Sequence, residues 1–339
     1  MKKKVYLLVG PYNAIGGVNI HLTRLSYILI DHYDIKYINE SPQKVYHKNV
    51  FNLRTINLIK YIYFILCCDV VHIHTGAWWL RIVHTIFARL MRKKTIVTIH
   101  SLTNLQSRKS RHLTKSFMML ADKVVVVSEQ IKGVLKIKNS IVIPAFIPPQ
   151  IKDEKDLPIS IVNLLERSNE KIIISNASDL IKHKGQDLYG LDILIEVAIR
   201  IKKEKLNCKI IFVLASVTKN VDLLKNYEEI IRTKQIENII HIYTKPISFI
   251  KLILCCDLVI RATNDDGDSI TIREALYFQK PVIASDVVKR PEGTIIFQNR
   301  DSNDLYYKIK KVFEEDRTVR NEKIDVNSIN NKYLELISR

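Results

Sequence analysis

The sequence predicts an α/β fold with two domains, each built on a parallel sheet that is buried on both faces. The chain has 339 residues, about twice the usual size of one domain. Short apolar runs rich in β-branched residues, such as 4–10, 95–100 and 171–176, alternate with longer stretches of helical periodicity such as 19–31. Runs that are apolar throughout are typical of strands covered on both faces, and strand–helix alternation is typical of parallel sheets.

A segment rich in prolines and charges, residues 146–158, separates the two sets of predicted strands. Its prolines suit neither a central strand nor a helix interior. We therefore predict an N-terminal domain over residues 1–150, a linker over 151–170 and a C-terminal domain over 171–320. The last segment, 321–339, is predicted to be helical and to pack back on the first domain.

Two seven-residue segments, 65–71 and 253–259, resemble each other, with the letters ILCCDVV and ILCCDLV. Each follows a predicted helix and enters a predicted strand. The likeness is either chance or a sign that both halves are Rossmann-like units built to one plan, and we favour the second interpretation.

Nearly all of the positive charge lies in the first half of the chain. The net charge is +18, and residues 1–150 hold 22 Lys/Arg against 6 Asp/Glu, whereas residues 151–339 hold 31 against 29. This asymmetry predicts a polyanionic partner for the first domain, either membrane lipid, a phosphate-bearing acceptor or nucleic acid. We favour an anionic membrane surface, because the sequence shows no nucleic-acid-binding module; the alternative is a merely solvated charged face. The expected membrane or acceptor surface comprises Arg92, Lys93, Lys94, Arg108, Lys109 and Arg111.

The apolar segments are too short to act as membrane spans. The run after Lys4 ends in a turn at Gly10, which does not suit a signal peptide, and the stretch 56–68 is interrupted by Asn57 and Lys60. We expect a cytoplasmic protein that is peripheral at the inner face of the membrane. The five cysteines lack the spacing of metal ligands, and we expect them to be buried free thiols in a reducing compartment.

Ligands of open parallel sheets bind at the carboxyl ends of the strands, where the strand order reverses. The first such turn carries Gly16 and Gly17 just before a predicted helix, which suits an anion but equally suits an ordinary turn. His74 and His100 follow two strands and are expected to point at one ligand. We favour hydrogen bonding over metal binding there, because no carboxylate or third ligand accompanies them.

The segment 261–276 carries the strongest indication of a site. Gly267 allows a tight turn, and Asp268 or Ser269 is expected to cap a helix whose first amides suit a diphosphate. Glu274 lies about one and a half turns into that helix, and its side chain leans back over the helix start. The alternative is a capped surface helix with solvated acids.

Asp266 and Glu274, with seven residues between them, resemble the E-x7-E region of retaining family 4 glycosyltransferases. The letters KPVIASD at 280–286 continue this likeness. Further segments resemble the same family in the same order, namely 16–18, 69–74, 98–100, 121–128, 143–144 and 190–196. The resemblance covers about residues 3–300. It implies the GT-B fold, in which two Rossmann-like domains face each other across a cleft.

The resemblance also implies roles for particular residues. Glu274 would bind the ribose of the nucleotide, His100 would face the donor sugar, and Gly16 and Gly17 would approach the diphosphate. Asp266 would hold sugar hydroxyls. The amides expected to assist it are those of Gly267, Asp268, Ser269 and Ile270.

Two features depart from the family pattern. The first acid is usually Glu, but Asp266 is one methylene shorter. Tyr189 stands where the family has a Lys that neutralises the diphosphate, and the preceding loop is expanded. Lys182 or Lys184 is expected to supply that charge instead.

The function implied by the resemblance is transfer of a sugar from a nucleotide-sugar donor to a hydroxyl of a lipid-linked saccharide or polysaccharide, as in surface polysaccharide synthesis. The configuration at the anomeric carbon would be retained, with no metal and no cofactor. Two alternatives are a nucleotide-sugar epimerase of the same fold and a non-catalytic binding protein that kept the fold.

Overall fold

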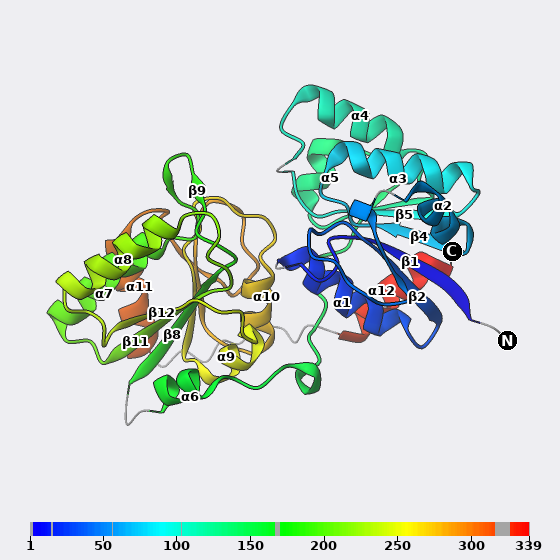
Figure 1. Cartoon of the computed structure of the whole chain (residues 1–339). Helices are drawn as coiled ribbons and strands as arrows, with labels where there is room; N and C mark the ends of the chain where they lie inside the picture. The colour runs from blue at the N-terminus through cyan, green and yellow to red at the C-terminus, as the bar shows by residue number, and fades with distance from the viewer. Residues whose placement is uncertain are drawn as a thin grey trace. The chain divides into compact units, whose positions relative to one another are not determined.

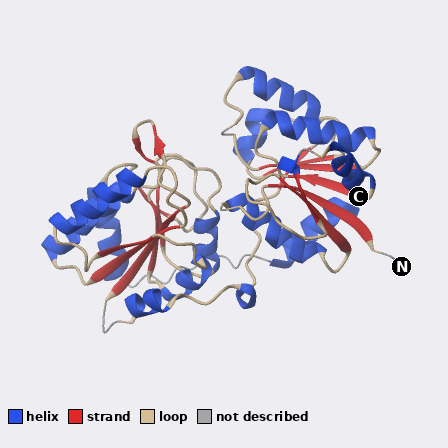
Figure 2. Cartoon of the chain, in the orientation of Figure 1, coloured by secondary structure: helices blue, strands red, loops and turns tan. Residues whose placement is uncertain are grey.

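The computed structural model describes residues 3–14, 16–55, 57–102, 104–166, 170–315 and 326–338. The chain divides into two compact units (Figure 1). Unit 1 comprises Met1–Ile147 together with Asp325–Arg339, and unit 2 comprises Pro148–Ile324. Each unit is a parallel sheet with helices on both faces (Figure 2), so the predicted fold class of two Rossmann-like α/β domains is confirmed.

Unit 1 contains a seven-stranded sheet in which every neighbouring pair is parallel. Its strands are β1 (Lys4–Gly10), β2 (Tyr33–Asn39), β3 (Val50–Asn52), β4 (Val70–Ile73), β5 (Lys94–Ile99), β6 (Lys123–Val126) and β7 (Ser140–Val142). The order β3-β2-β1-β4-β5-β6-β7 places β1 beside both β2 and β4. The strand order therefore reverses between β1 and β4, which makes this the ligand-binding edge expected of an open sheet.

The helices of unit 1 form two layers because the strands bury both faces. They are α1 (Gly17–Leu29), η1 (Leu53–Thr55), α2 (Leu58–Leu66), α3 (Trp78–Leu90), α4 (Arg108–Met118), α5 (Glu129–Leu135) and α12 (Val326–Ser338). Tyr6 and Leu8 of β1 pack with α1 and α12, whereas Leu7 and Val9 pack with the layer of α2 to α5, as the alternation of side chains along a strand requires. Tyr333 of α12 is fully buried in the first of these layers. Residues 321–325 and 339 of the predicted C-terminal segment lie outside the described residues.

Unit 2 contains a six-stranded parallel sheet and a small antiparallel hairpin. The sheet strands are β8 (Lys171–Ala177), β11 (Cys208–Leu214), β12 (Ile240–Tyr243), β13 (Leu258–Arg261), β14 (Val282–Ser285) and β15 (Ile295–Phe297); the hairpin pairs β9 (Lys182–His183) with β10 (Gln186–Asp187). The order β12-β11-β8-β13-β14-β15 reverses between β8 and β13. The second ligand-binding edge is therefore at the carboxyl ends of these two strands.

The helices of unit 2 also cover both faces of the sheet. They are η2 (Ile151–Asp153), α6 (Ile159–Leu165), α7 (Leu191–Glu204), α8 (Val221–Thr233), α9 (Phe249–Cys255), α10 (Ile270–Tyr277) and α11 (Ser302–Glu314). One apolar layer contains side chains of α7, α8 and α11, and the other contains side chains of α6, α9 and α10.

The predicted linker, residues 151–170, differs in the structure because it contains η2 and α6. Ile161 of α6 is fully buried in the core of unit 2. Pro158 stands immediately before α6 as its N-cap residue, a place where the missing N–H of proline costs no helical hydrogen bond. Residues 167–169 of this range lie outside the described residues.

The aspartate of the repeated ILCCD segment makes the same kind of hydrogen bond in both units. Asp69, just before β4, accepts a hydrogen bond from the amide of Val5 at 2.8 Å, and Asp257, just before β13, accepts one from the amide of Ile172 at 2.6 Å. In each unit the aspartate thus ties the strand that follows it to the start of the neighbouring strand, β1 or β8. Both ties lie beside the point where the strand order reverses, which supports the interpretation that the two halves share one plan.

The cysteines are all free, but they are not all buried as predicted. Cys68, Cys208 and Cys256 are buried, Cys67 is half-buried and Cys255 is exposed. Cys255 is the last residue of α9 and faces solvent, whereas the next residue, Cys256, lies in the core of unit 2. Within the described part of the chain, every helix is too short or too polar to cross a bilayer.

Candidate active site

The carboxyl ends of β8 and β13 lie side by side in unit 2, and the loop 262–269 leads from β13 into α10. Gly190, the N-cap residue of α7, lies directly against this loop. A Cβ at Gly190 would lie 2.2 Å from the carbonyl oxygen of Ala262, and the φ of +73° also favours glycine. The start of α7 therefore packs against the beginning of the loop and fixes its position at the end of β13.

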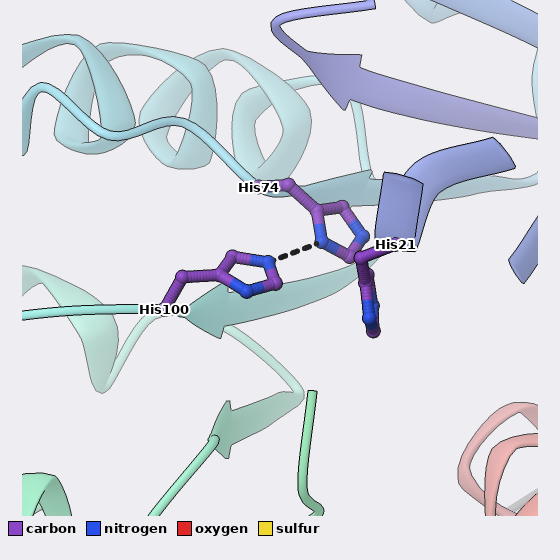
Figure 3. A group of neighbouring side chains, drawn as sticks. All are labelled: His21, His74 and His100. Carbon is purple, nitrogen blue, oxygen red and sulfur yellow. Dashed lines mark hydrogen bonds between the residues drawn. The ribbon is translucent and has the colours of Figure 1, made fainter. Parts of the chain in front are cut away.

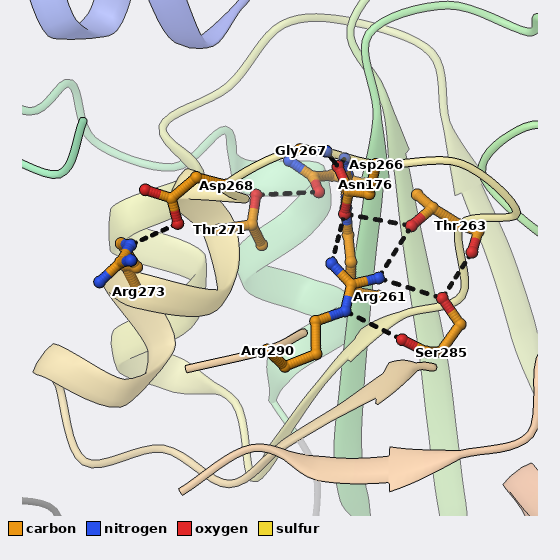
Figure 4. A network of polar contacts seen from close by, with 10 residues as sticks. All are labelled: Asn176, Arg261, Thr263, Asp266, Gly267, Asp268, Thr271, Arg273, Ser285 and Arg290. Carbon is orange, nitrogen blue, oxygen red and sulfur yellow. Dashed lines mark hydrogen bonds and ion pairs between the residues drawn. The ribbon is translucent and has the colours of Figure 1, made fainter. Parts of the chain in front are cut away.

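Asp266 is the centre of a polar network in this loop (Figure 4). Its side chain is only 9% exposed, and its two oxygens accept five hydrogen bonds. The donors are Arg261 through Nε and Nη2, both at 3.1 Å, Arg290 through Nη1 at 2.8 Å, Thr263 through Oγ1 at 3.1 Å and the amide of Gly267 at 3.0 Å.

These contacts bear on the predicted role of Asp266. A carboxylate offers about four lone-pair sites, and all are engaged by the five donors. Burial alone would raise the pKa of Asp266, but the charges and hydrogen bonds of Arg261 and Arg290 outweigh it and lower the pKa to about 2. A sugar hydroxyl would have to displace one of these donors. The geometry therefore favours Asp266 as a residue that positions the loop, while contact with the sugar stays a prediction.

Arg261 and Arg290 are the site residues that the sequence analysis missed. The Arg261 guanidinium lies over the Tyr189 ring at 5.2 Å, and the Tyr189 hydroxyl is hydrogen-bonded to Ser178 at 2.8 Å. Tyr189 occupies the position where the family has a lysine, so a cation is present there after all, supplied by a neighbouring strand. The sequence signal that could have revealed Arg261 is an arginine at the end of an otherwise apolar strand, since ligands bind at strand ends.

The lysines that were expected to supply this charge lie elsewhere in the fold. Lys182 and Lys184 are exposed on the β9–β10 hairpin, and Lys184 has a positive φ of 50° next to Gly185. The hairpin is the structural form of the expanded loop before Gly190. Arg261, at the carboxyl end of β13, is the better-placed cation in unit 2.

The start of α10 is not capped in the way that the sequence suggested. Ser269 is the N-cap residue, but its side chain makes no capping hydrogen bond within the described residues. Asp268 instead accepts a hydrogen bond from Arg273 at 2.5 Å. A helix start without a side-chain cap keeps first-turn amides available for an anion.

Glu274 lies on the buried face of α10 and is 4% exposed. Thr271, three residues earlier on the same face, donates a hydrogen bond to Asn176 at the end of β8 at 3.3 Å. This contact directs the face that carries Glu274 toward the reversal point of the sheet. A buried carboxylate at such an edge suits a ligand that offers hydroxyl donors.

In unit 1, His74 and His100 lie at the ends of β4 and β5 and form a hydrogen bond of 3.0 Å between Nδ1 and Nε2 (Figure 3). His21 of α1 completes a trio in which one ring nitrogen of each residue lies within 4.8 Å of the others. The Nδ1–H of His21 donates to the carbonyl of Ala145 at 2.7 Å, which leaves its Nε2 as an acceptor. We expected neither a carboxylate nor a third ligand beside the two histidines; the structure supplies a third candidate ligand, His21, from a helix.

The trio is neutral at physiological pH. Burial lowers the pKa of His21 to about 4 and lowers those of His74 and His100 well below the usual range. Three neutral rings are a possible metal site by geometry. However, the trio includes no carboxylate, and the charges of Arg24 and Arg81 oppose a further cation. Hydrogen bonding to a polar ligand stays the favoured interpretation.

The glycine turn lies at the reversal point between β1 and β4. Gly16 has a φ of 138° and is the N-cap residue of α1, which begins at the exposed Gly17. His21 is one turn further along the same helix. The turn and the trio are thus parts of one edge of unit 1, as expected of a ligand site in an open sheet.

The two predicted basic stretches lie at opposite edges of the unit 1 sheet. Arg92, Lys93 and Lys94 follow the end of α3, at the edge where β5 begins. Arg108, Lys109 and Arg111 form the first turn of α4, which follows the end of β5. A helix that returns between parallel strands runs antiparallel to them, so it spans the distance from one edge to the other.

The fold and these two sheet-edge sites define a GT-B protein, and solved structures support this class. The Anabaena protein HepE in complex with UDP and glucose is 16% identical, covers 99% of both chains and has a TM-score of 0.75. A glycosyltransferase from Rickettsia africae is 20% identical over 99% of this chain and 98% of its own, with a TM-score of 0.74. Sucrose-phosphate synthase from Thermosynechococcus elongatus is 14% identical over 99% and 95%, with a TM-score of 0.66. At these identities the likeness shows the fold.

The sequence of the first domain matches one family model. Residues 15–149 match the model described as Glycosyltransferase Family 4. No curated protein matches the chain. The match lies in the first domain, and together with the GT-B fold it supports the resemblance to retaining, nucleotide-sugar-dependent glycosyltransferases of family 4.

Proposed function

We propose that this enzyme transfers a sugar from a uridine diphosphate donor to a hydroxyl of a lipid-linked saccharide or a growing polysaccharide at the inner face of the membrane. The uridine nucleotide is suggested by HepE, whose structures contain UDP, or UDP-glucose. The lipid-linked acceptor is suggested by the positive charge of the first domain. The concentration of that charge in one domain is hard to explain for a small neutral acceptor.

The observation that carries the proposal is the reversal point of unit 2. There the uncapped start of α10 offers amides to a diphosphate, and the buried Glu274 follows on the same helix. Arg261 and Arg290 share the single carboxylate of Asp266, so this group of three side chains keeps one net positive charge at the adjacent strand end. Oriented amides and a fixed cation stabilise the negative charge that develops on a departing nucleoside diphosphate, without a metal ion.

Unit 1 would bind the acceptor, and its histidine trio would take part in recognising the sugar that is transferred. The trio of neutral histidines offers both a donor and acceptors of hydrogen bonds at the edge that also carries Gly17. We assign His100 to the donor sugar, in line with the family resemblance, and His21 and His74 to the orientation of its ring. No cofactor is required by this scheme.

A ligand screen tests the proposal. UDP and UDP-glucose are expected to raise the melting temperature of the purified chain, because a ligand that binds only the folded state stabilises it by about 2.7 kcal/mol at 100 times its Kd. NAD is the matched control, since it also carries a diphosphate and a ribose, and it should cause no shift. A shift with NAD alone, or none with a panel of nucleotide-sugars, would contradict the proposal.

A further inference from the structure

Helix α2 of unit 1 exposes an apolar stripe. Ile59, Tyr63 and Leu66 follow each other at helical spacing, and each side chain is more than half exposed. The opposite side of the helix, with Tyr61 and Ile65, is buried in the core. The stripe therefore adds nothing to the packing of unit 1, and exposed apolar residues that gather on one face mark a contact surface.

Helix α3 continues this surface. Trp79, Val83 and Leu90 form a second exposed stripe, with exposed fractions of 56%, 37% and 74%. The inward side of α3 contacts α2, because the Tyr61 hydroxyl and His84 Nδ1 are hydrogen-bonded at 2.7 Å. The two helices therefore belong to one layer on one face of the sheet and contact each other on their inward sides.

Helix α4 packs beside α3 in the same layer (Figure 1). Unlike α2 and α3, it exposes a basic stripe. Its outward residues are Arg108, Lys109, His112 and Lys115. Its inward residues include Thr114 and Met118. The outer face of the layer thus changes from apolar on α2 and α3 to basic on α4.

Acidic residues are almost absent from this part of the chain. Residues 41–121 hold thirteen Lys/Arg and a single acid, Asp69, which is committed to the amide of Val5. Lys93, which follows α3, donates a hydrogen bond to the carbonyl of Leu66 at the end of α2 at 2.8 Å, so a basic residue lies where these two helices end. The next acid along the chain, Asp122, is paired with Arg89 of α3 at 3.0 Å. The border of the apolar surface is therefore cationic on balance, which complements an anionic lipid surface.

We propose that the outer face of the α2–α3–α4 layer docks on an anionic bilayer, with the apolar stripes entering the interface and the α4 stripe contacting headgroups. This rests on the proposed function for its purpose, since a membrane contact serves a lipid-linked acceptor. Trp and Tyr are enriched at bilayer interfaces, and basic residues near anionic lipid each contribute about 1 kcal/mol. A second copy of this chain is a poorer occupant, because a symmetric contact would bring two positive faces together.

The docked orientation follows from the direction of the helices. Trp79 lies five residues after His74, so α3 begins at the edge that carries the histidine trio, and it ends at the opposite edge with Leu90. With the layer flat on the bilayer, both predicted basic stretches reach the lipid although they lie at opposite edges of the sheet. The histidine edge is then close to the headgroups where a lipid-linked acceptor is presented.

Vesicle binding by the full chain tests this surface. The only two tryptophans are the adjacent Trp78 and Trp79, so their fluorescence reports insertion of α3. We expect a blue shift with vesicles of phosphatidylcholine and phosphatidylglycerol, and none with phosphatidylcholine alone. Ile59→Ser with Tyr63→Ser should weaken binding on the order of 100-fold, because two large apolar side chains lose their burial in lipid. The matched control, Ile30→Ser with Tyr46→Ser, changes exposed residues outside the layer and should bind as the parent does.

Salt separates the two parts of the contact. Lys109→Glu with Lys115→Glu should reduce binding at least about tenfold at low salt and have little effect at 1 M salt, where the Debye length is about 3 Å. The variant with Ile59→Ser and Tyr63→Ser should bind vesicles weakly at both low salt and 1 M salt. Equal binding by the serine variants and the parent would overturn the proposal, as would a parent that binds no vesicle. So would a parent dimer that these changes dissociate, since the stripes would then meet a second copy.

Nucleotide binding without vesicles is measured for every variant, and its absence in the parent would count against the proposed function alone.

Discussion

Asp266→Asn is expected to destabilise unit 2 by about 3–5 kcal/mol, because it removes the negative charge between two arginines and leaves them uncompensated. The side chains of Asp266 and Arg290 are 9% and 2% exposed, so water replaces little of the lost interaction. The midpoint of urea unfolding measures this effect. Asp222→Asn is the control, since its ion pair with Lys225 is almost fully exposed and should change stability by less than about 1 kcal/mol.

The same carboxylate predicts a dependence on pH. The pKa of Asp266 is about 2 in the folded chain, below the ordinary aspartate value of 3.8 that applies to an unfolded chain. A lowered folded-state pKa contributes stability above the unfolded pKa, so this contribution is present above pH 4 and is lost as the pH falls toward 2. It amounts to roughly 2 kcal/mol, and Asp266→Asn should lack it. If Asp266→Asn has the same urea midpoint as the parent but fails to transfer sugar, Asp266 contacts the sugar, as the family resemblance implies.

Glu274→Ala is expected to weaken nucleotide binding by about 1.5–3 kcal/mol, the usual loss when a charged hydrogen-bond partner is removed. This corresponds to about 10- to 150-fold in Kd. Calorimetric titration with UDP measures it, and Glu274→Gln is the matched control that keeps the shape and one acceptor and should lose less. An unchanged Kd in the alanine variant would show that Glu274 does not contact the nucleotide. Urea unfolding of both variants separates lost binding from lost folding.

The strands and their order along the chain were predictable because the signal is local. Continuous apolar runs such as 4–10 and 171–176 are typical of strands buried in a parallel sheet, and both are strands in the structure. Because the strands are parallel, the turns that follow them all lie at the carboxyl ends of the strands. This is why His74 and His100 could be expected to approach each other. The predicted linker shows the limit of the local signal, since Pro158 was taken as a breaker and instead precedes α6.

The partners within each site were not predictable because they come from distant parts of the chain. Arg290 reaches Asp266 from 24 residues away, and His21 reaches the trio from a helix whose periodicity marks only an apolar face. Which residues fill the lone pairs of Asp266 depends on side-chain packing across three strand ends. The family pattern could therefore suggest the two acids, but it could not show that a pair of arginines holds the first of them.

The most direct test is proton NMR of the purified enzyme with UDP-glucose in excess EDTA, first without an acceptor and then with detergent-dispersed lipid-linked saccharide. We expect slow release of UDP by hydrolysis, faster release with the acceptor, and a new glycosidic bond with the same anomeric configuration as the donor. Release that stops in EDTA and returns with magnesium would contradict the metal-free mechanism. An inverted product, or no turnover of any nucleotide-sugar by protein that binds it, would contradict the assignment as a retaining transferase.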